Sequence, residues 1–460
     1  MYGATMVPDD IQIGFDQITG MSEREEPIEE VIEDFWLRLD NAAKMYPAIL
    51  SREFTTVFRI SAELKEPVRI KPFFKAVHRV EERFPYYKMK LKRGFFWYYL
   101  EHHNIPVHVQ HDNQGLCRGF GKDNDQGLLF RILVRDETIS VEFSHILTDG
   151  HGAMEFFKTL LVTYFSELGL TVPDDLTYFQ PQARIDRDEL EDSFHRYFKK
   201  DLPKRIHLRK AFHLPYTIRR TSGLSVLKAT LSMESIKKQA GVYAVSITEY
   251  LVSIYLYSLQ QVFRELDEPR KRKSHRLLRI QVPVNLRNIF PSRSMRNFTL
   301  FVLPEIDLRL GYYSFREILK KVHHLMQLEK DQKLISRTIS RNVGSERDKI
   351  LRSLPLFVKS MILQTQYYHL GANLYSGELT NLGKVDLSPG LNDRIESFTF
   401  VPPPPNKALK VDCGVIGFKD KLVMTFGNIT QTKAFEQRFL HTLSQQGLLY
   451  QMETIQEEAL

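Results

Sequence analysis

The sequence predicts an α/β fold made of two related sandwich domains, each with a sheet covered by helices. Three observations lead to this prediction. The chain has 460 residues, which is more than a single hydrophobic core usually spans. Its hydrophobic content of 43% is enough to fill two cores. Segments with the two-residue period of strands alternate with segments of helical period in both halves of the chain.

The first half begins with an alternating strand and an amphipathic helix, and short aromatic-rich strands follow. A buried strand, a polar turn at residues 135–137 and a second alternating strand then form a predicted hairpin. A long apolar helix comes after it. The segments are residues 54–64 (strand), 68–84 (helix), 86–109 (three short strands), 128–134 and 138–143 (hairpin) and 152–168 (helix).

The second half repeats this mixture after a polar connection at residues 174–210. Ser246 and Glu249 have the spacing of a capping box at the start of a strong helix. Four consecutive prolines at 402–405 predict a stiff surface linker. The other segments are strands at 224–231, before Asn285, from Phe298, and near Leu374, Ser397, Val415 and Leu422, with helices at 315–334, at 346–368 and from Ala434.

These patterns divide the chain into a flexible tail (1–27), an N-terminal half (28–205) and a C-terminal half (206–460). The start of the chain has neither the basic residues nor the apolar stretch of a secretory signal. No apolar run reaches the ~18 residues that a membrane span needs. The two cysteines, Cys117 and Cys413, are too few for a disulfide framework and have no metal-ligand spacing around them. We therefore expect a cytoplasmic protein with no transmembrane segment and no metal site.

The charge pattern gives little reason to expect nucleic-acid binding. The net charge of +8 is modest for this length, although it can help to attract an anionic substrate. The densest basic stretch, residues 270–276, has no interleaved aromatics and no nucleic-acid motif. We expect it to be a solvated loop between a helix and a strand, and leave open a contact with a nucleotide phosphate.

A histidine stands four residues before an Asp-Gly pair at the end of the second hairpin strand. The residues are His145, Asp149 and Gly150. An imidazole can take and return a proton near neutral pH, and a glycine lets the backbone turn sharply. A histidine at a strand end, ahead of a helix, is well placed to face a cleft. The alternative is a buried or capping histidine held by a backbone carbonyl.

This His-x-x-x-Asp-Gly pattern, about a third of the way along the chain, resembles the chloramphenicol-acetyltransferase-like superfamily, which includes alcohol acetyltransferases and peptide-synthetase condensation domains. Three further segments match in the family's order. They are residues 281–287 (QVPVNLR) with 296–298 (RNF), residues 380–385 (TNLGKV) and residues 412–428 (DCGVIGFKDKLVMTFGN). The resemblance covers the chain from about residue 30 to 447.

The chain also departs from the family pattern. Ser144 stands where many members have a first histidine, but the second histidine is the catalytic one in the family, and His145 keeps that place. The Asp-Phe-Gly-Trp-Gly signature of the plant enzymes is absent, and neither the wax-synthase nor the condensation-domain signature is complete. The resemblance is therefore closest to the alcohol acetyltransferase branch.

The resemblance implies two chloramphenicol-acetyltransferase-like α/β sandwich domains with an active-site tunnel between them. It implies a CoA-dependent O-acyltransferase with His145 as general base and no covalent enzyme intermediate. Asp149, the second residue of the catalytic pair, would be a structural carboxylate paired with Arg287. Gly150 would serve the turn. Asn381, Thr380 and Asn297 are candidates for the oxyanion donor or for the tunnel lining.

No bound cofactor is expected, because acyl-CoA (acetyl-CoA) would be the co-substrate and a small alcohol or amine the acceptor. Two alternatives stay open. The donor can instead be the thioester of an acyl carrier protein, which makes the chain a carrier-dependent acyltransferase or a condensation-type enzyme. The chain can also be a catalytically silent binding scaffold of the same fold.

Overall fold

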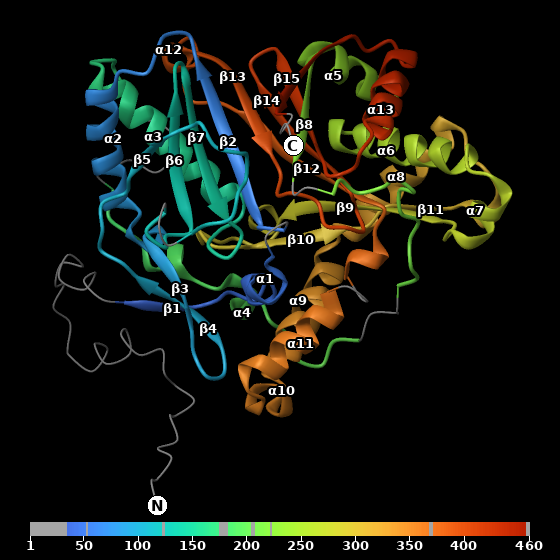
Figure 1. Cartoon of the computed structure of the whole chain (residues 1–460), viewed down its shortest axis with the longest axis horizontal. Coiled ribbons are helices and arrows are strands. Elements are labelled where there is room, and N and C mark those ends of the chain that lie inside the picture. The colour runs from blue at the N-terminus through green and yellow to red at the C-terminus, as the bar shows by residue number, and fades with distance from the viewer. Residues whose placement is uncertain are drawn as a thin grey trace, which may run out of the picture.

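Two large β-sheets lie side by side and form the frame of the molecule (Figure 1). The computed structural model describes residues 35–51, 54–121, 125–173, 183–203, 208–220, 223–367 and 371–456. The predicted tail at residues 1–27 and part of the predicted connection at 174–210 lie outside the described residues. Helices cover both sheets, so the predicted α/β class is confirmed.

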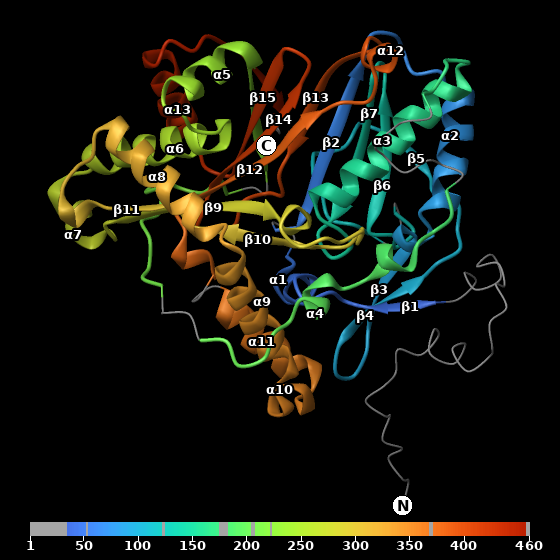
Figure 2. The ribbon, with the colours of Figure 1, turned by 180° about the vertical axis from the view of Figure 1, so that it is seen from behind.

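The first sheet has the strand order β13-β2-β7-β6-β5. β6 and β7 form the predicted hairpin and turn at Asp136, which has a φ of 51°. Helices α2 and α3 lie on one face of this sheet (Figure 2), and their apolar residues form one core with it. The elements are β2 (Val57–Leu64), α2 (Ile70–Arg83), β5 (Val109–His111), β6 (Phe130–Arg135), β7 (Thr138–Ser144), α3 (Gly150–Glu167) and β13 (Ile395–Val401).

A smaller sheet with the order β1-β4-β3 adjoins the first sheet. β3 (Met89–Arg93) and β4 (Tyr98–His102) lie in the aromatic-rich stretch and confirm two of its predicted strands, and β5 begins at its end. β1 (Trp36–Arg38) was not predicted. It has only three residues, too few to show a period, and its pairing with β4 defines it.

The second sheet has eight strands and is covered by apolar helices. Its order is β10-β9-β12-β14-β15-β8-β16, with β11 paired to β9. The strands are β8 (Ser225–Ser232), β9 (Leu277–Asn285), β10 (Thr299–Val302), β11 (Glu305–Asp307), β12 (Gly377–Val385), β14 (Val411–Phe418), β15 (Lys421–Asn428) and β16 (Tyr450–Gln456). The helices packed in its core include α5 (Met233–Val242), α6 (Ile247–Arg264), α8 (Phe315–Glu329) and α13 (Ala434–Gln445).

The sequence prediction missed α5 and β16, and the helix boundaries between residues 315 and 368 were wrong. Four helices occupy that region: α8, α9 (Gln332–Arg347), α10 (Lys349–Ser353) and α11 (Leu356–Gln366). Asp331 and Asp348 set the boundaries, because each accepts two backbone N–H groups of the next helix. Pro355 precedes α11. The predicted break before residue 346 lies inside α9.

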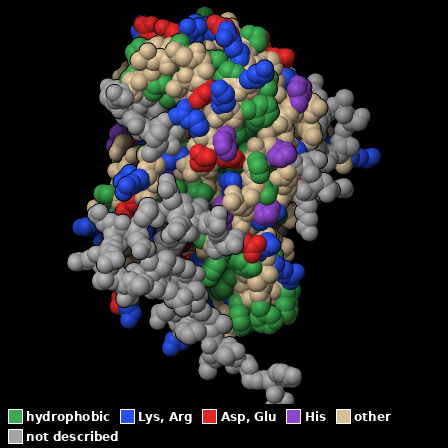
Figure 3. Space-filling view, turned by 90° about the vertical axis from the view of Figure 1, so that its left-hand side faces the viewer, with side chains coloured by type: hydrophobic (Ala, Val, Ile, Leu, Met, Phe, Trp, Pro, Cys, Tyr) green, Lys and Arg blue, Asp and Glu red, His purple; other side chains and the backbone are tan. Residues whose placement is uncertain are grey.

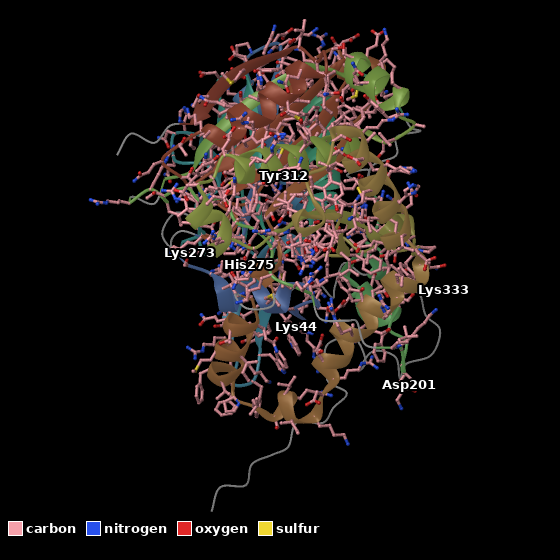
Figure 4. All side chains as sticks on the ribbon, turned by 90° about the vertical axis from the view of Figure 1, so that its right-hand side faces the viewer. Lys44, Asp201, Lys273, His275, Tyr312 and Lys333 are labelled. Atoms are coloured by element: carbon pink, nitrogen blue, oxygen red, sulfur yellow. The ribbon has the colours of Figure 1, made fainter. Side chains whose placement is uncertain are left out.

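Two other local predictions were also wrong. The basic stretch expected to be a loop contains a short exposed helix, α7 (Glu268–Lys273), which Asp267 caps. Lys273 and His275 of this stretch lie at one edge of the molecule (Figure 4). The proline run at 402–405 does join strands β13 and β14, but three of its four residues are buried.

No single helix among the described residues is long and apolar enough to cross a membrane. The consecutive helices α5 and α6 meet the length and composition criteria only together, across a bend of 81°.

Two segments of the second half cross to the first. β13 pairs with β2, and the Thr425 hydroxyl of β15 donates to the Phe400 carbonyl of β13 at 2.5 Å. The segment between β9 and β10 reaches the first half through Met295, which lies in the first core. β13 is a strand of the first sheet, although its residues belong to the second half of the chain. A domain boundary after residue 205 therefore stays a prediction. These two crossings bring the His145 loop against the second half.

Candidate functional site

His145 lies directly after β7, where the chain leaves the first sheet. Its backbone N–H donates to the Thr56 carbonyl at 3.0 Å. Its own carbonyl accepts from the side-chain amide of Asn297 at 2.9 Å. The histidine backbone is therefore held from both halves of the chain, while its side chain stays partly exposed.

One hydrogen bond determines the tautomer of His145. Nδ1 lies 3.2 Å from the Thr148 carbonyl oxygen. A carbonyl oxygen only accepts, so in the neutral ring Nδ1 carries the hydrogen and Nε2 has the free lone pair. Burial lowers the pKa of His145, although the Asp149 charge and the Thr148 carbonyl act in the opposite direction. The imidazole is therefore a neutral proton acceptor at Nε2 near pH 7.

Two aromatic rings flank the imidazole. The Phe58 ring of β2 has its centroid 4.6 Å from that of His145. The Tyr46 ring stacks on it at 5.6 Å from α1 (Tyr46–Ile49). Rings on two sides restrict the rotation of the imidazole and keep its orientation fixed. Neither aromatic residue was singled out from the sequence, because each comes from a distant segment with no recognisable motif.

Asp149 is saturated with donors and does not contact the imidazole. Its Oδ1 accepts from the backbone N–H groups of His151 and Gly152, at 3.2 and 3.1 Å, which makes it the N-cap of α3. Its Oδ2 accepts from Arg287 at 2.8 Å. The same oxygen also accepts from the Phe298 N–H, just before β10, and from the Thr299 hydroxyl, at the start of β10. Burial opposes ionisation, but the Arg287 guanidinium and these donors hold the pKa of Asp149 well below its usual range.

The expected pairing of Asp149 with Arg287 is thus present in the structure. Arg287 also donates from Nε to the Ser294 carbonyl at 2.9 Å and from Nη2 to the Arg296 carbonyl at 2.5 Å. Its side chain holds the returning loop of the second half in one shape. The same loop presents the Met295 carbonyl to the Thr148 hydroxyl at 2.6 Å.

The turn role expected for Gly150 was wrong. Gly150 is the first residue of α3, and its φ is not in the left-handed region. A Cβ there would lie 2.6 Å from a terminal methyl of Leu382 in β12, so Gly150 allows β12 to approach. Gly152 is more constrained, since a Cβ there would lie 2.2 Å from the Thr148 hydroxyl and 2.5 Å from the Met295 carbonyl. The sequence prediction missed Gly152, although a second glycine two residues after the Asp-Gly pair could have indicated it.

Asn297 contacts His145 from the second half of the chain, and its side chain acts to raise the pKa of the imidazole. Its side-chain amide donates to His145 O and, at 3.0 Å, to the carboxylate of Asp40. Asp40 is fully buried, and burial raises its pKa to about 6 even though Arg296 is nearby. Both amide hydrogens of Asn297 are therefore engaged, so its expected role as an oxyanion donor does not fit this geometry.

Thr380 and Asn381 lie on β12, the strand that Gly150 approaches. The Thr380 hydroxyl donates to Glu378 at 3.0 Å. The Asn381 amide donates to the Thr248 hydroxyl at 3.0 Å, and its oxygen accepts from Gly383 N–H at 2.8 Å. Both residues are partly exposed. Their hydrogen bonds leave the second amide hydrogen of Asn381 with no acceptor among the described residues.

A pair of carboxyl groups accompanies Thr380. Glu378 and Asp412 are register partners in the parallel strands β12 and β14. Asp412 is buried, and its Oδ1 has no hydrogen-bond partner among the described residues. Burial raises the pKa of both groups, and the neighbouring Glu378 charge raises that of Asp412 further. Burial is the main cause that raises the pKa of the Tyr46 phenol, and the charge of Glu378 raises this pKa further. This pair was not anticipated from the sequence.

The comparisons with known proteins agree with this architecture. No protein-family model matches the chain, and a search of curated proteins finds no significant relative. Solved structures do match over almost the whole chain. The TRI101 protein of F. graminearum, in complex with coenzyme A and T-2 mycotoxin, has a TM-score of 0.58 at 12% identity, covering 90% of this chain and 99% of its own.

Two further structures match at the same level. Polyketide synthase associated protein 5 from Mycobacterium tuberculosis has a TM-score of 0.56 at 13% identity, covering 89% of this chain and 98% of its own. The epimerization domain from the third module of tyrocidine synthetase B has a TM-score of 0.54 at 12% identity, covering 93% and 97%. The chain therefore shares the overall fold of these proteins, and the chloramphenicol-acetyltransferase-like fold expected from the sequence is confirmed.

Proposed function

We propose that this chain is an acyltransferase that moves an acyl group, acetyl or another short acyl, from a CoA thioester to a hydroxyl acceptor. The observation that carries the proposal is the 3.2 Å contact of His145 Nδ1 with the Thr148 carbonyl, which favours the tautomer that has its lone pair on Nε2. In support, a structure of this fold contains coenzyme A together with a small molecule, the T-2 mycotoxin.

In the proposed step, Nε2 of His145 removes the proton of the acceptor hydroxyl as its oxygen attacks the thioester carbonyl carbon. The carbon–sulfur bond then breaks, and the proton on Nε2 passes to the departing thiolate. The products are an ester and free coenzyme A, so atoms and charges balance. Positioned acid–base catalysis of this kind contributes roughly 10²–10⁴-fold to the rate.

Asp149 has a positioning role in this proposal. Its five hydrogen bonds and its low pKa leave it no capacity to take a proton. It instead joins the start of α3 to β10, with the His145 turn held between them. The negative charge that develops on the thioester oxygen needs a donor, and we propose the Asn381 amide or the Thr380 hydroxyl of β12 for this role.

A carrier-protein thioester is the second candidate donor, because condensation-type domains share the fold. The test compares the two donors directly. Thiol release is measured from acetyl-CoA and from an acetylated acyl carrier protein, each with a panel of alcohols and amines. Acceptor-dependent release from acetyl-CoA supports the proposal. Release only from the carrier protein would mean that the donor is a carrier-protein thioester and not acetyl-CoA. Release from neither donor would favour the catalytically silent binding scaffold.

A further inference from the structure

Five large hydrophobic side chains are exposed together at one end of the molecule. Two come from the turn of the β3–β4 hairpin and three from α10 and α11. We refer to them as the apolar tip: Phe95, Phe96, Ile350, Phe357 and Met361, with exposed fractions of 72, 46, 74, 60 and 66%. In Figures 1 and 2 the hairpin and α10 project side by side at the lower end. Figure 3 shows hydrophobic side chains gathered at the lower end of another face.

The contacts between the two segments make the apolar tip one surface. The Leu356 N–H donates to the Phe95 carbonyl at 2.9 Å. The Lys359 ammonium donates to the Phe96 carbonyl at 3.1 Å and lies 3.7 Å from the centre of the Trp97 ring. Phe357 and Met361 are four residues apart in α11 and so lie on one helix face. The exposed side chains therefore project from two segments that are hydrogen-bonded to each other.

The two segments that form the apolar tip also expose basic residues. Arg93, Lys349 and Arg352 are exposed in the two segments that form it, residues 93–97 and 348–361. The single acidic residue in these segments is Asp348, and one of its carboxylate oxygens already caps α10. The tip thus combines projecting aromatic and aliphatic side chains with a net positive rim. The surface complementary to this tip is a layer with a negatively charged exterior and an apolar interior.

The tip is also joined to the wall of the candidate site. The Gln364 side chain of α11 donates to the Ala48 carbonyl of α1 at 2.7 Å. Helix α1 begins with Tyr46, whose ring stacks on His145. A surface bound by the tip would therefore lie close to the elements that flank His145.

We propose that the apolar tip docks onto a membrane that contains anionic lipids. Aromatic side chains favour the boundary between headgroups and acyl chains. Basic residues beside them are attracted to the negative surface of such a membrane. A projecting tip can enter a lipid layer without the matching concave surface that a protein partner would have to supply. This proposal does not depend on the acyltransfer reaction, and its test uses binding alone.

The test is co-sedimentation of the full-length chain with vesicles. One set is pure phosphatidylcholine and the other an equal mixture of phosphatidylcholine and phosphatidylserine. We expect binding to the mixed vesicles that weakens as salt rises. The double variant Phe95→Ser/Phe96→Ser and the charge-reversal variant Arg93→Glu/Lys349→Glu should each reduce binding about tenfold or more. Leu310→Ser and Leu449→Ser are matched controls, because those leucines are 79 and 86% exposed elsewhere, and they should bind as the wild type does.

Several results would overturn the proposal. One is absence of binding to mixed vesicles, and another is equal binding by the wild type and both tip variants. A third is a concentration-dependent dimer in light scattering that Phe95→Ser/Phe96→Ser dissociates, because the tip would then cover a second copy of the chain. Circular dichroism checks that each variant is folded. If the Phe95→Ser/Phe96→Ser variant is not folded, the charge-reversal variant decides the outcome of the test.

Discussion

The carboxylate of Asp149 and the guanidinium of Arg287 lie 2.8 Å apart, across the junction between the two halves of the chain. Asp149 caps the helix that follows the His145 turn, and Arg287 holds the loop that returns from the second sheet. The side chains of both residues are nearly buried, at 5 and 6% exposure. The pair therefore fixes the position of one half's histidine turn relative to the other half.

Removing either partner of this pair should destabilise the fold. Arg287→Met leaves the Asp149 carboxylate buried without its cation, and such losses cost about 3–5 kcal/mol. Urea unfolding at neutral pH measures the change. Arg394→Ala, which removes an exposed ion pair with Glu66, is the matched control and should cost less than ~1 kcal/mol. Equal small effects of the two substitutions would contradict the structural role of Arg287.

Asn297 should affect catalysis through the backbone of His145. In Asn297→Ala the His145 carbonyl and the Asp40 carboxylate both lose the amide that joins them. A shift of the imidazole of even ~1 Å can cost about 10²-fold in rate. We expect kcat to fall by roughly 10–100-fold with a smaller change in KM. An unchanged kcat, with the variant folded by thermal melting, would show that the carbonyl needs no support.

The pH dependence of the reaction should report a base with a low pKa. Burial lowers the pKa of His145 below its ordinary value of 6.5. Because the neutral imidazole is the active form, kcat/KM should stay constant from neutral pH down to below 6.5 and fall only at lower pH. A profile of kcat/KM against pH on an acceptor that does not itself titrate tests this. A midpoint above 6.5 would contradict the downward shift of the His145 pKa.

The Glu378 carboxyl should make stability depend on pH in a defined direction. Burial raises its pKa from 4.5 to about 7, so the folded state keeps this proton where the unfolded chain has lost it. The contribution of this group to the stability is therefore fully present below pH 4.5 and is lost as the pH rises to about 7. Glu378→Gln mimics the protonated form, and its advantage over the wild type in urea unfolding should grow over this range to at most ~3 kcal/mol.

The exposed Glu137→Gln is the control for this measurement and should show no such growth. An advantage of Glu378→Gln that is independent of pH would mean that Glu378 does not hold its proton in the folded state.

The sequence was informative where a residue's role depends on its neighbours in the chain. The hairpin before His145 and the capping box at Ser246 were predicted from such local patterns, whereas the pairing of Asp149 with Arg287 was expected from the family resemblance. In each case a period, a local capping pattern or a motif with ordered partners carries the information. These features were enough to predict the fold class and to select His145 as the centre of the candidate site.

The rest of the site depends on contacts between distant segments. Tyr46, Phe58 and Asp40 reach His145 and Asn297 only because the sheets and the returning loop meet there. Nothing in their local sequence distinguishes them from ordinary core residues. The role of Gly150 was misjudged for the same reason, since the atom it makes room for belongs to Leu382, more than two hundred residues later.

His145 has the proposed role of the base in an acyltransfer reaction. The most direct measurement is thiol release from acetyl-CoA with and without an acceptor, for the wild type and for His145→Ala, with His275→Ala as an exposed control. We predict acceptor-dependent release that falls roughly 10²–10⁴-fold in His145→Ala and is unchanged in His275→Ala. Acceptor-dependent release that survives in a folded His145→Ala variant would contradict this role.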